Sequence, residues 1–303
     1  MNNIKISLRN YSKDKERYKK YRKQLLEILK RVSADFSIEI TVLVKILDLS
    51  KGYTLDGKSA RENIAYVLMK KDYAMLSISS SVFDMFENNQ ELDLEIVLYH
   101  EFIHMYDLTS ISHLSYFKNC SVDEINLNTK QNYNIKAGIH FWSEFIAYLK
   151  TYQNYRKWYK LYTNPCELEY IYLSIIDKLD IAKNATSYKK KGLLIKDIFE
   201  TIDIFAYNFA LYIASMFGGD RRRIKDKGKY YNKDSMEVIM KIIDDLVIYI
   251  RKLIHTLNTN KFVKNLEKLG HYINYKIYNR FGCKIKKDNG NYIMAFNMKQ
   301  LEK

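Results

Sequence analysis

The alternation of apolar and polar residues divides the chain into a mixed first part and a long helical second part. Apolar residues at helical spacing predict an amphipathic helix over residues 11–31. Runs rich in β-branched residues predict strands at 36–49, 64–70 and 73–79, of which the last two are expected to form a hairpin. A further helical region, predicted over 81–108, is interrupted near the sequence ENNQ.

Helical periodicity dominates the second part of the chain. A polar, asparagine-rich segment at 109–136 is predicted to be a long loop, of the kind that is usually functional or mobile. Near the C-terminus, Asn-Gly between two short apolar runs predicts a β-hairpin within KIKKDNGNYIMAF. Between them, apolar residues recur at helical spacing over 137–161, 168–183, 193–217, 235–257 and 261–278. Together these elements predict an α+β fold.

The domain boundary is expected near Pro165, the only proline in the chain. It separates a first domain over 1–165 from a helical second domain over 166–303. The longest uncharged stretch, 204–219, has sixteen residues. This is short for a membrane span and predicts a buried helix, so no membrane partner is expected.

The composition is that of a globular protein. The 303 residues are 47% hydrophobic and 28% charged, enough to bury a core, which excludes global disorder. Three cysteines without a CxxC pair argue against a disulfide framework. The N-terminal sequence is charged from the start and has no apolar signal region, so a cytoplasmic location is expected.

The net charge of +15 has two interpretations. One is attraction to an anionic partner such as nucleic acid. The best support for it is the basic segment 221–234, RRRIKDKGKYYNKD, which includes a tyrosine pair. The other, which we favour, is a lysine-rich composition with a solvated loop at 221–234, because no recognisable nucleic-acid motif accompanies this segment.

The segment LYHEFIHMYD, residues 98–107, carries the chemistry. His100 and His104 are four residues apart, so on a helix their imidazoles share one face and can bind one metal ion. Glu101 is rotated by about 100° from His100, so it is placed to act as a base rather than as a third ligand. The alternative is a histidine pair satisfied by local hydrogen bonds in the core. The apolar run LDLEIVLY before the motif makes unpartnered polar groups there costly.

A third protein ligand has to come from elsewhere in the chain. The best candidate is Glu144, 40 residues after His104 in the apolar sequence IHFWSEFIAYLK, with the small Ala147 one turn further on. Asp107 shares the face of the two histidines but is almost two turns from the first. We therefore interpret Asp107 as a supporting partner of His104 or a helix cap. The rival ligands are His140 and His113.

The pattern His100-Glu101-x-x-His104, followed by Glu144-x-x-Ala147, resembles the gluzincin group of zincin metallopeptidases. In particular it is similar to the ImmA/IrrE neighbourhood of bacterial phages and integrative elements, over about residues 36–150. The resemblance implies a zincin-like first half in which a short β-sheet precedes the motif helix. It also implies Zn²⁺ held by the two histidines and Glu144, with Glu101 as general base.

The function expected from this resemblance is zinc-dependent endopeptidase activity on a peptide or protein substrate. A peptide is expected along an edge strand at 73–79. Two alternatives stay open: a zincin-fold protein that no longer cleaves, and a basic nucleic-acid-binding regulator of a mobile element. No cofactor besides zinc is expected, and the oxyanion stabiliser is open among Tyr148, His140 and Tyr207.

Overall fold

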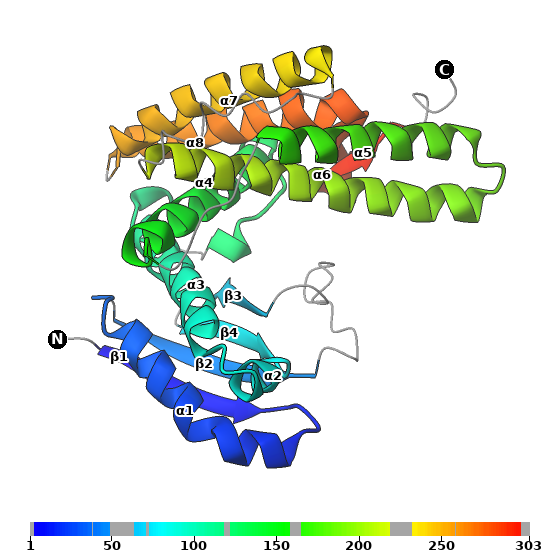
Figure 1. Ribbon diagram of the computed structural model, residues 1–303. Helices are drawn as coiled ribbons and strands as arrows, with labels where there is room; N and C mark the ends of the chain where they lie inside the picture. The colour runs from blue at the N-terminus through cyan, green and yellow to red at the C-terminus, as the bar shows by residue number, and fades with distance from the viewer. Residues whose placement is uncertain are drawn as a thin grey trace. The chain divides into compact units, whose positions relative to one another are not determined.

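The computed structural model describes residues 3–37, 39–48, 64–70, 73–117, 122–157, 165–218, 232–257 and 259–297. The chain divides into two compact units. One comprises Met1–Glu124 with Gln153–Tyr159, and the other comprises Ile125–Tyr152 with Lys160–Lys303. The predicted α+β class is confirmed: a mixed four-stranded sheet with helices comes first and is followed by a mostly helical part (Figure 1).

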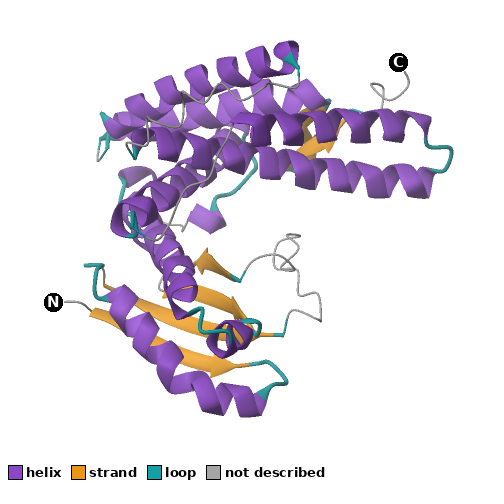
Figure 2. Cartoon of the chain, viewed as in Figure 1, coloured by secondary structure: helices purple, strands orange, loops and turns teal. Residues whose placement is uncertain are grey.

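The first unit is built on a sheet of order β1-β2-β4-β3 (Figure 2). β1, β2 and β4 run parallel, whereas β3 is antiparallel to β4. All residues of β4 after its first are buried, which is typical of an interior strand in a largely parallel sheet. The strands are β1 (Asn3–Asn10), β2 (Glu39–Leu47), β3 (Ala65–Met69) and β4 (Tyr73–Ser79).

Three helices accompany this sheet: α1 (Lys15–Ser33), α2 (Val82–Glu87) and α3 (Glu91–Ser112). The carboxylate of Asp14 caps α1 by accepting the N–H of Arg17 at 3.1 Å. α1 also connects the parallel strands β1 and β2 and packs against α3, while α3 packs against β3. The motif helix therefore rests on the edge of the sheet that β3 forms.

The predicted hairpin of 64–70 with 73–79 is confirmed, as are the helix over 11–31 and the strand over 36–49. The prediction that 73–79 is an edge strand is wrong, because β4 pairs with β2 on one side and β3 on the other. The prediction also omitted β1, in which apolar residues alternate with polar ones at Ile4, Ile6 and Leu8.

The second unit is an assembly of helices with a terminal hairpin. Its helices are α4 (Lys130–Asn154, which belongs to this unit as far as Tyr152), α5 (Pro165–Asn184), α6 (Tyr188–Phe217), α7 (Lys233–Ile254) and α8 (Asn260–Tyr272). α8 continues into a π-helical turn, Ile273–Ile277, and a 3₁₀ turn, Tyr278–Phe281. The predicted hairpin is confirmed as β5 (Cys283–Asp288) paired with β6 (Asn291–Phe296).

The predicted loop over 109–136 is wrong in extent. α3 continues to Ser112, two short 3₁₀ turns follow at Ser115–Phe117 and Val122–Glu124, and α4 already begins at Lys130. The polar residues that suggested a loop occupy the exposed first turn of α4. There the hydroxyl of Thr129 accepts the N–H of Asn132 at 3.1 Å.

α4 and α8 cross with their backbones in close contact. A Cβ atom on Gly138 would lie 2.0 Å from the carbonyl oxygen of Leu266, and one on Gly270 would lie 1.7 Å from that of Asn134. Only glycine permits such an approach. Beside this crossing, Asn134 accepts a buried hydrogen bond from Asn274 at 2.9 Å, which fixes the register of the two helices.

Residues 204–217 of the apolar segment that was predicted to be a buried helix lie within α6. Phe205, Phe209 and Ile213 on this helix are completely buried. Within the described part of the chain, no helix is both long enough and apolar enough to span a bilayer. The basic segment 221–234 falls largely outside the described residues, which resume at 232.

Candidate metal centre

α3 carries the motif and is buried on more than one side. It begins after Gln90 with acidic Glu91 and Asp93 in its first turn, where they favour the positive end of the helix dipole. Its buried positions include Leu98, Phe102 and Ile103, so apolar contacts surround the motif. A helix that is apolar nearly all round is typical of a protein interior.

Aromatic and ionic contacts within the first unit hold α3 in place. Phe36 packs against Tyr99 and Phe102, with ring centroids 5.2 and 5.9 Å apart. Glu95 accepts hydrogen bonds from Arg31 at 2.8 Å and from the hydroxyl of Tyr155 at 3.1 Å. Burial, together with the Glu95 carboxylate, raises the pKa of Tyr155 well above its usual value, so this hydroxyl stays a donor.

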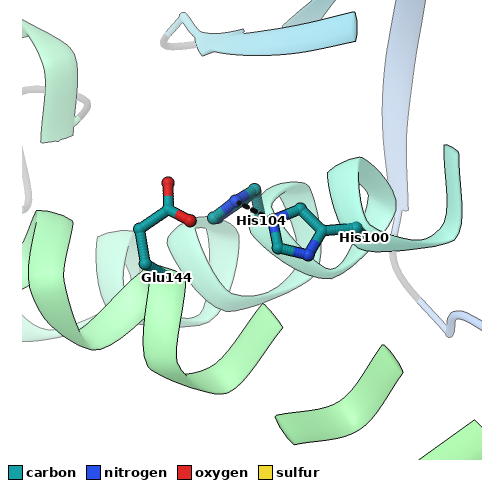
Figure 3. A group of neighbouring side chains, drawn as sticks. All are labelled: His100, His104 and Glu144. Atoms are coloured by element: carbon teal, nitrogen blue, oxygen red, sulfur yellow. Dashed lines mark hydrogen bonds between the residues drawn. The ribbon is translucent and has the colours of Figure 1, made fainter. Parts of the chain in front are cut away.

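His100 and His104 point the same way from consecutive turns of α3. Their Nε2 atoms lie 3.1 Å apart, and the ring planes are inclined by 79° (Figure 3). His104 is 9% exposed, whereas His100 is half-buried and more open to solvent. Two nitrogens at this spacing, each 2.0–2.1 Å from one zinc ion, would subtend about 100°, near the tetrahedral angle. The pair therefore fits a shared metal ion.

Glu144 belongs to α4, on a part of the helix that is otherwise mostly apolar. Its neighbours Trp142 and Phe145 are buried, and they pack edge-to-face on Phe262 and Phe217 at 5.5 Å each. Glu144 itself is half-buried. The packed face of α4 is thus fixed by aromatic rings, and the carboxylate lies off that face.

The structure brings together the three residues that were predicted to be ligands. One ligand atom from each of His100, His104 and Glu144 lies within 4.8 Å of the others, so this His-His-Glu group could hold a metal ion (Figure 3). Two imidazole nitrogens and one carboxylate are ligands that suit zinc. Neither Asp107 nor His140 is a member of the group.

The other candidates are placed as follows. Glu101 is half-buried on α3, directly after the first histidine, and Asp107 is 9% exposed on the same helix. His113 is exposed and ends α3 at its C-cap, so it does not contribute to the group. The residues considered for oxyanion stabilisation are half-buried on α4 and α6: His140, Tyr148 and Tyr207.

One contact near the sheet edge was not foreseen from the sequence. The carboxylate of Asp123 accepts the backbone N–H of Met69 at the end of β3, at 2.7 Å. This N–H points away from β4, because Lys70 bonds back to Tyr73 and the pattern alternates along the strand. Asp123 is followed directly by a second acidic residue, Glu124, and the sequence offers no signal that selects Asp123 for this role.

Comparison with known proteins adds no relative. No family model, no curated protein and no solved structure matches this chain. The resemblance to HExxH…E zinc sites is therefore carried by the three residues of the His-His-Glu group.

Proposed function

We propose that the protein is a zinc-dependent metallopeptidase whose metal ligands are His100, His104 and Glu144. The observation that supports this most is the His-His-Glu group, in which one ligand atom from each residue lies within 4.8 Å of the others. The two Nε2 atoms share a hydrogen bond across 3.1 Å, and a metal ion would instead bind both nitrogens together with the Glu144 carboxylate. Glu101, next to the first histidine, is the proposed general base.

Zinc at this site would act as a Lewis acid that lowers the pKa of a water molecule and polarises a peptide carbonyl. The Glu101 carboxylate would accept the proton of the attacking water and deliver it to the leaving amine. The two histidines and Glu144 would hold the ion, leaving space for water and substrate as in catalytic sites with three protein ligands.

The substrate is proposed to lie along β3 rather than β4, since β4 has no free edge. The N–H groups of Ala65, Val67 and Met69 point away from β4, and Asp123 occupies the last of them. Within the described part of the chain, the outward main-chain N–H and C=O groups of Val67 are thus available to pair with an extended peptide. We therefore propose that the enzyme is an endopeptidase that binds the main chain of its substrate.

Metal content and turnover of four proteins test the proposal. Wild type, prepared without chelators, should contain about one zinc per chain and cleave an unfolded protein substrate such as casein. Glu101→Gln should keep the zinc and lose turnover by at least about 100-fold, since general-base catalysis contributes that much. His104→Ala should lose both, whereas the exposed control His113→Ala should lose neither.

Each outcome separates one interpretation from another. Stoichiometric zinc without cleavage of any substrate would favour the alternative of a zincin-like protein that no longer cleaves. Absence of metal from wild type after incubation with zinc would refute the proposed site. If Glu144→Gln binds zinc as tightly as wild type, Glu144 is not the third ligand.

Val67→Pro tests the substrate position. Proline removes one outward N–H of β3 but none of the hydrogen bonds that join β3 to β4, and edge strands tolerate it. The Michaelis constant for a peptide should rise several-fold, while the zinc content stays unchanged. Val67→Ala keeps the N–H and is the control; an equal effect of both variants would contradict pairing through the main chain.

A further inference from the structure

One strongly basic part of the chain lies near its C-terminal end. Residues 251–288 contain ten lysines and arginines against two acidic residues, a net charge of +8 that only the N-terminal residues 1–31 equal among segments of similar length. Because this segment forms the end of α7, all of α8 and the strand β5, the charge lies on one continuous part of the second unit.

On α8 the charged residues share one face, which we call the basic stripe: Lys261, Lys264, Lys268 and His271. With 3.6 residues per turn, these four positions fall within an arc of about 80° over a length of about 15 Å. All four are exposed. Within the described residues, no ion pair neutralises the three lysines of the stripe.

The basic stripe ends in an aromatic pair. The ring of His271 is stacked on that of Tyr275, with centroids 4.3 Å apart and planes inclined by 28°. The ammonium group of Lys130 lies 4.8 Å from the centroid of Tyr275. Flat rings beside a row of cations are the elements with which proteins bind a nucleic-acid strand, because rings contact bases and cations contact phosphates.

The apolar face of α8 rules against a membrane surface as the partner. A helix that lies in a bilayer needs an exposed apolar face beside its basic one. On α8 that face is used within the unit, since Phe262, Leu266 and Leu269 are at most 1% exposed. The stripe therefore offers charge and rings without insertable side chains.

We propose that the basic stripe of α8 binds the phosphate backbone of a nucleic acid. The proposal uses none of the residues of the His-His-Glu group, so it stands whether or not the protein is a peptidase. Phosphates would contact Lys261, Lys264 and Lys268, and the ring pair at the end of the stripe would contact a base.

Fluorescence anisotropy with a labelled single strand of about 20 nucleotides, longer than one binding site of this kind, tests the proposal. The triple variant Lys261→Gln, Lys264→Gln, Lys268→Gln should lower the slope of log K against log salt by about 2, since each phosphate contact on a single strand contributes about 0.7. Affinity at about 0.1 M salt should fall on the order of 100-fold. Duplex DNA and RNA of the same sequence show which strand form is preferred.

The matched control removes the same charge from another helix. Lys189, Lys190 and Lys191 lie in the first turn of α6, so replacing all three by glutamine changes the net charge equally. This control should bind like wild type. The proposal is overturned if both triple variants weaken binding equally, if wild type binds no nucleic acid, or if polyglutamate competes as well as the strand does. Binding to anionic phospholipid vesicles that the stripe variant abolishes would instead assign the stripe to a membrane.

Discussion

The close contact of α4 and α8 at Gly270 allows the loss of stability in Gly270→Ala to be predicted. A Cβ on Gly270 would lie 1.7 Å from the oxygen of Asn134 and 2.7 Å from the nitrogen of Gly138, where ordinary contact begins near 3.4 Å. Both atoms belong to backbone, so no side chain can rotate to make room. Gly270→Ala therefore requires the helices to separate by roughly 1.5 Å, which would weaken the neighbouring contact of Trp142 with Phe262.

The size of the effect follows from two opposing terms. Overpacking of this kind costs about 1–3 kcal/mol and more when rigid backbone is in the way. The higher helix propensity of alanine opposes this by raising the free energy of unfolding by about 1 kcal/mol. Because the clash is with rigid backbone, the gross cost is taken as at least about 3 kcal/mol, so the expected net loss for Gly270→Ala is about 2 kcal/mol or more. For Gly192→Ala on α6, a Cβ would meet nothing within 4 Å, so only the propensity term acts and stability should rise by about 0.5–1 kcal/mol.

Urea unfolding followed by the fluorescence of Trp142 measures this difference. The side chain is 1% exposed and lies edge-to-face against Phe262, so its emission reports the contact of α4 with α8. All proteins would carry Trp158→Phe, because the chain has two tryptophans. The midpoint should fall for Gly270→Ala and rise for Gly192→Ala, with similar slopes. If Gly270→Ala is stabilised as much as Gly192→Ala, the two helices do not touch at this point.

Two further predictions concern buried groups of the second unit. Burial and the Asp203 carboxylate raise the pKa of Cys283 to about 12, so the thiol's stabilising contribution is complete below pH 9 and is lost as the pH rises toward 12. The difference in unfolding free energy between wild type and Cys283→Ala should therefore shrink by about 2 kcal/mol between pH 7.5 and 10.5. An unchanged difference would contradict burial of the thiol. Glu169 is completely buried and accepts hydrogen bonds from the N–H of Asn232 at 2.8 Å and the hydroxyl of Ser235 at 2.9 Å. Glu169→Ala should therefore lower the free energy of unfolding in urea by about 2–4 kcal/mol. The control Glu167→Ala, at an exposed position, should change it little.

Local patterns in the sequence predicted local structure well. The helices and the two hairpins follow from periodicity and turn residues, because both depend on residues close together in the chain. β1 was missed although Ile4, Ile6 and Leu8 alternate, since its partner Glu39–Ile46 lies more than thirty residues away and α1 separates the two strands. Parallel pairing leaves no turn signal between neighbouring strands.

The order of strands could have been inferred in part. β4 reads YAMLSIS, an almost continuous run of residues suited to burial on both faces, which is typical of a central strand. The prediction of an edge strand at 73–79 relied instead on the position of this strand directly before the motif helix. Strand order also depends on which edge of the sheet the chain returns to, and residues within a single strand do not specify that edge.

The third ligand was chosen from the sequence by a weak argument, the presence of a small residue near a lone carboxylate. A stronger signal was present in the same helix. Gly138 marks the face of α4 that touches α8, since glycine inside a helical pattern often indicates close backbone contact. Glu144 is six residues further on, about 240° around the helix, and so cannot lie on that face.

The same register places His140 and Tyr148 within about 40° of Glu144, and all three are half-buried. α4 therefore has one face fixed by glycine and aromatic contacts and a second face that carries polar groups, as α3 does with its two histidines. If this second face serves the metal, His140→Ala should change zinc affinity or turnover while leaving the unfolding midpoint nearly unchanged, and Gly138→Ala should do the reverse. Equal loss of stability in both variants would show that α4 has no face set apart for chemistry.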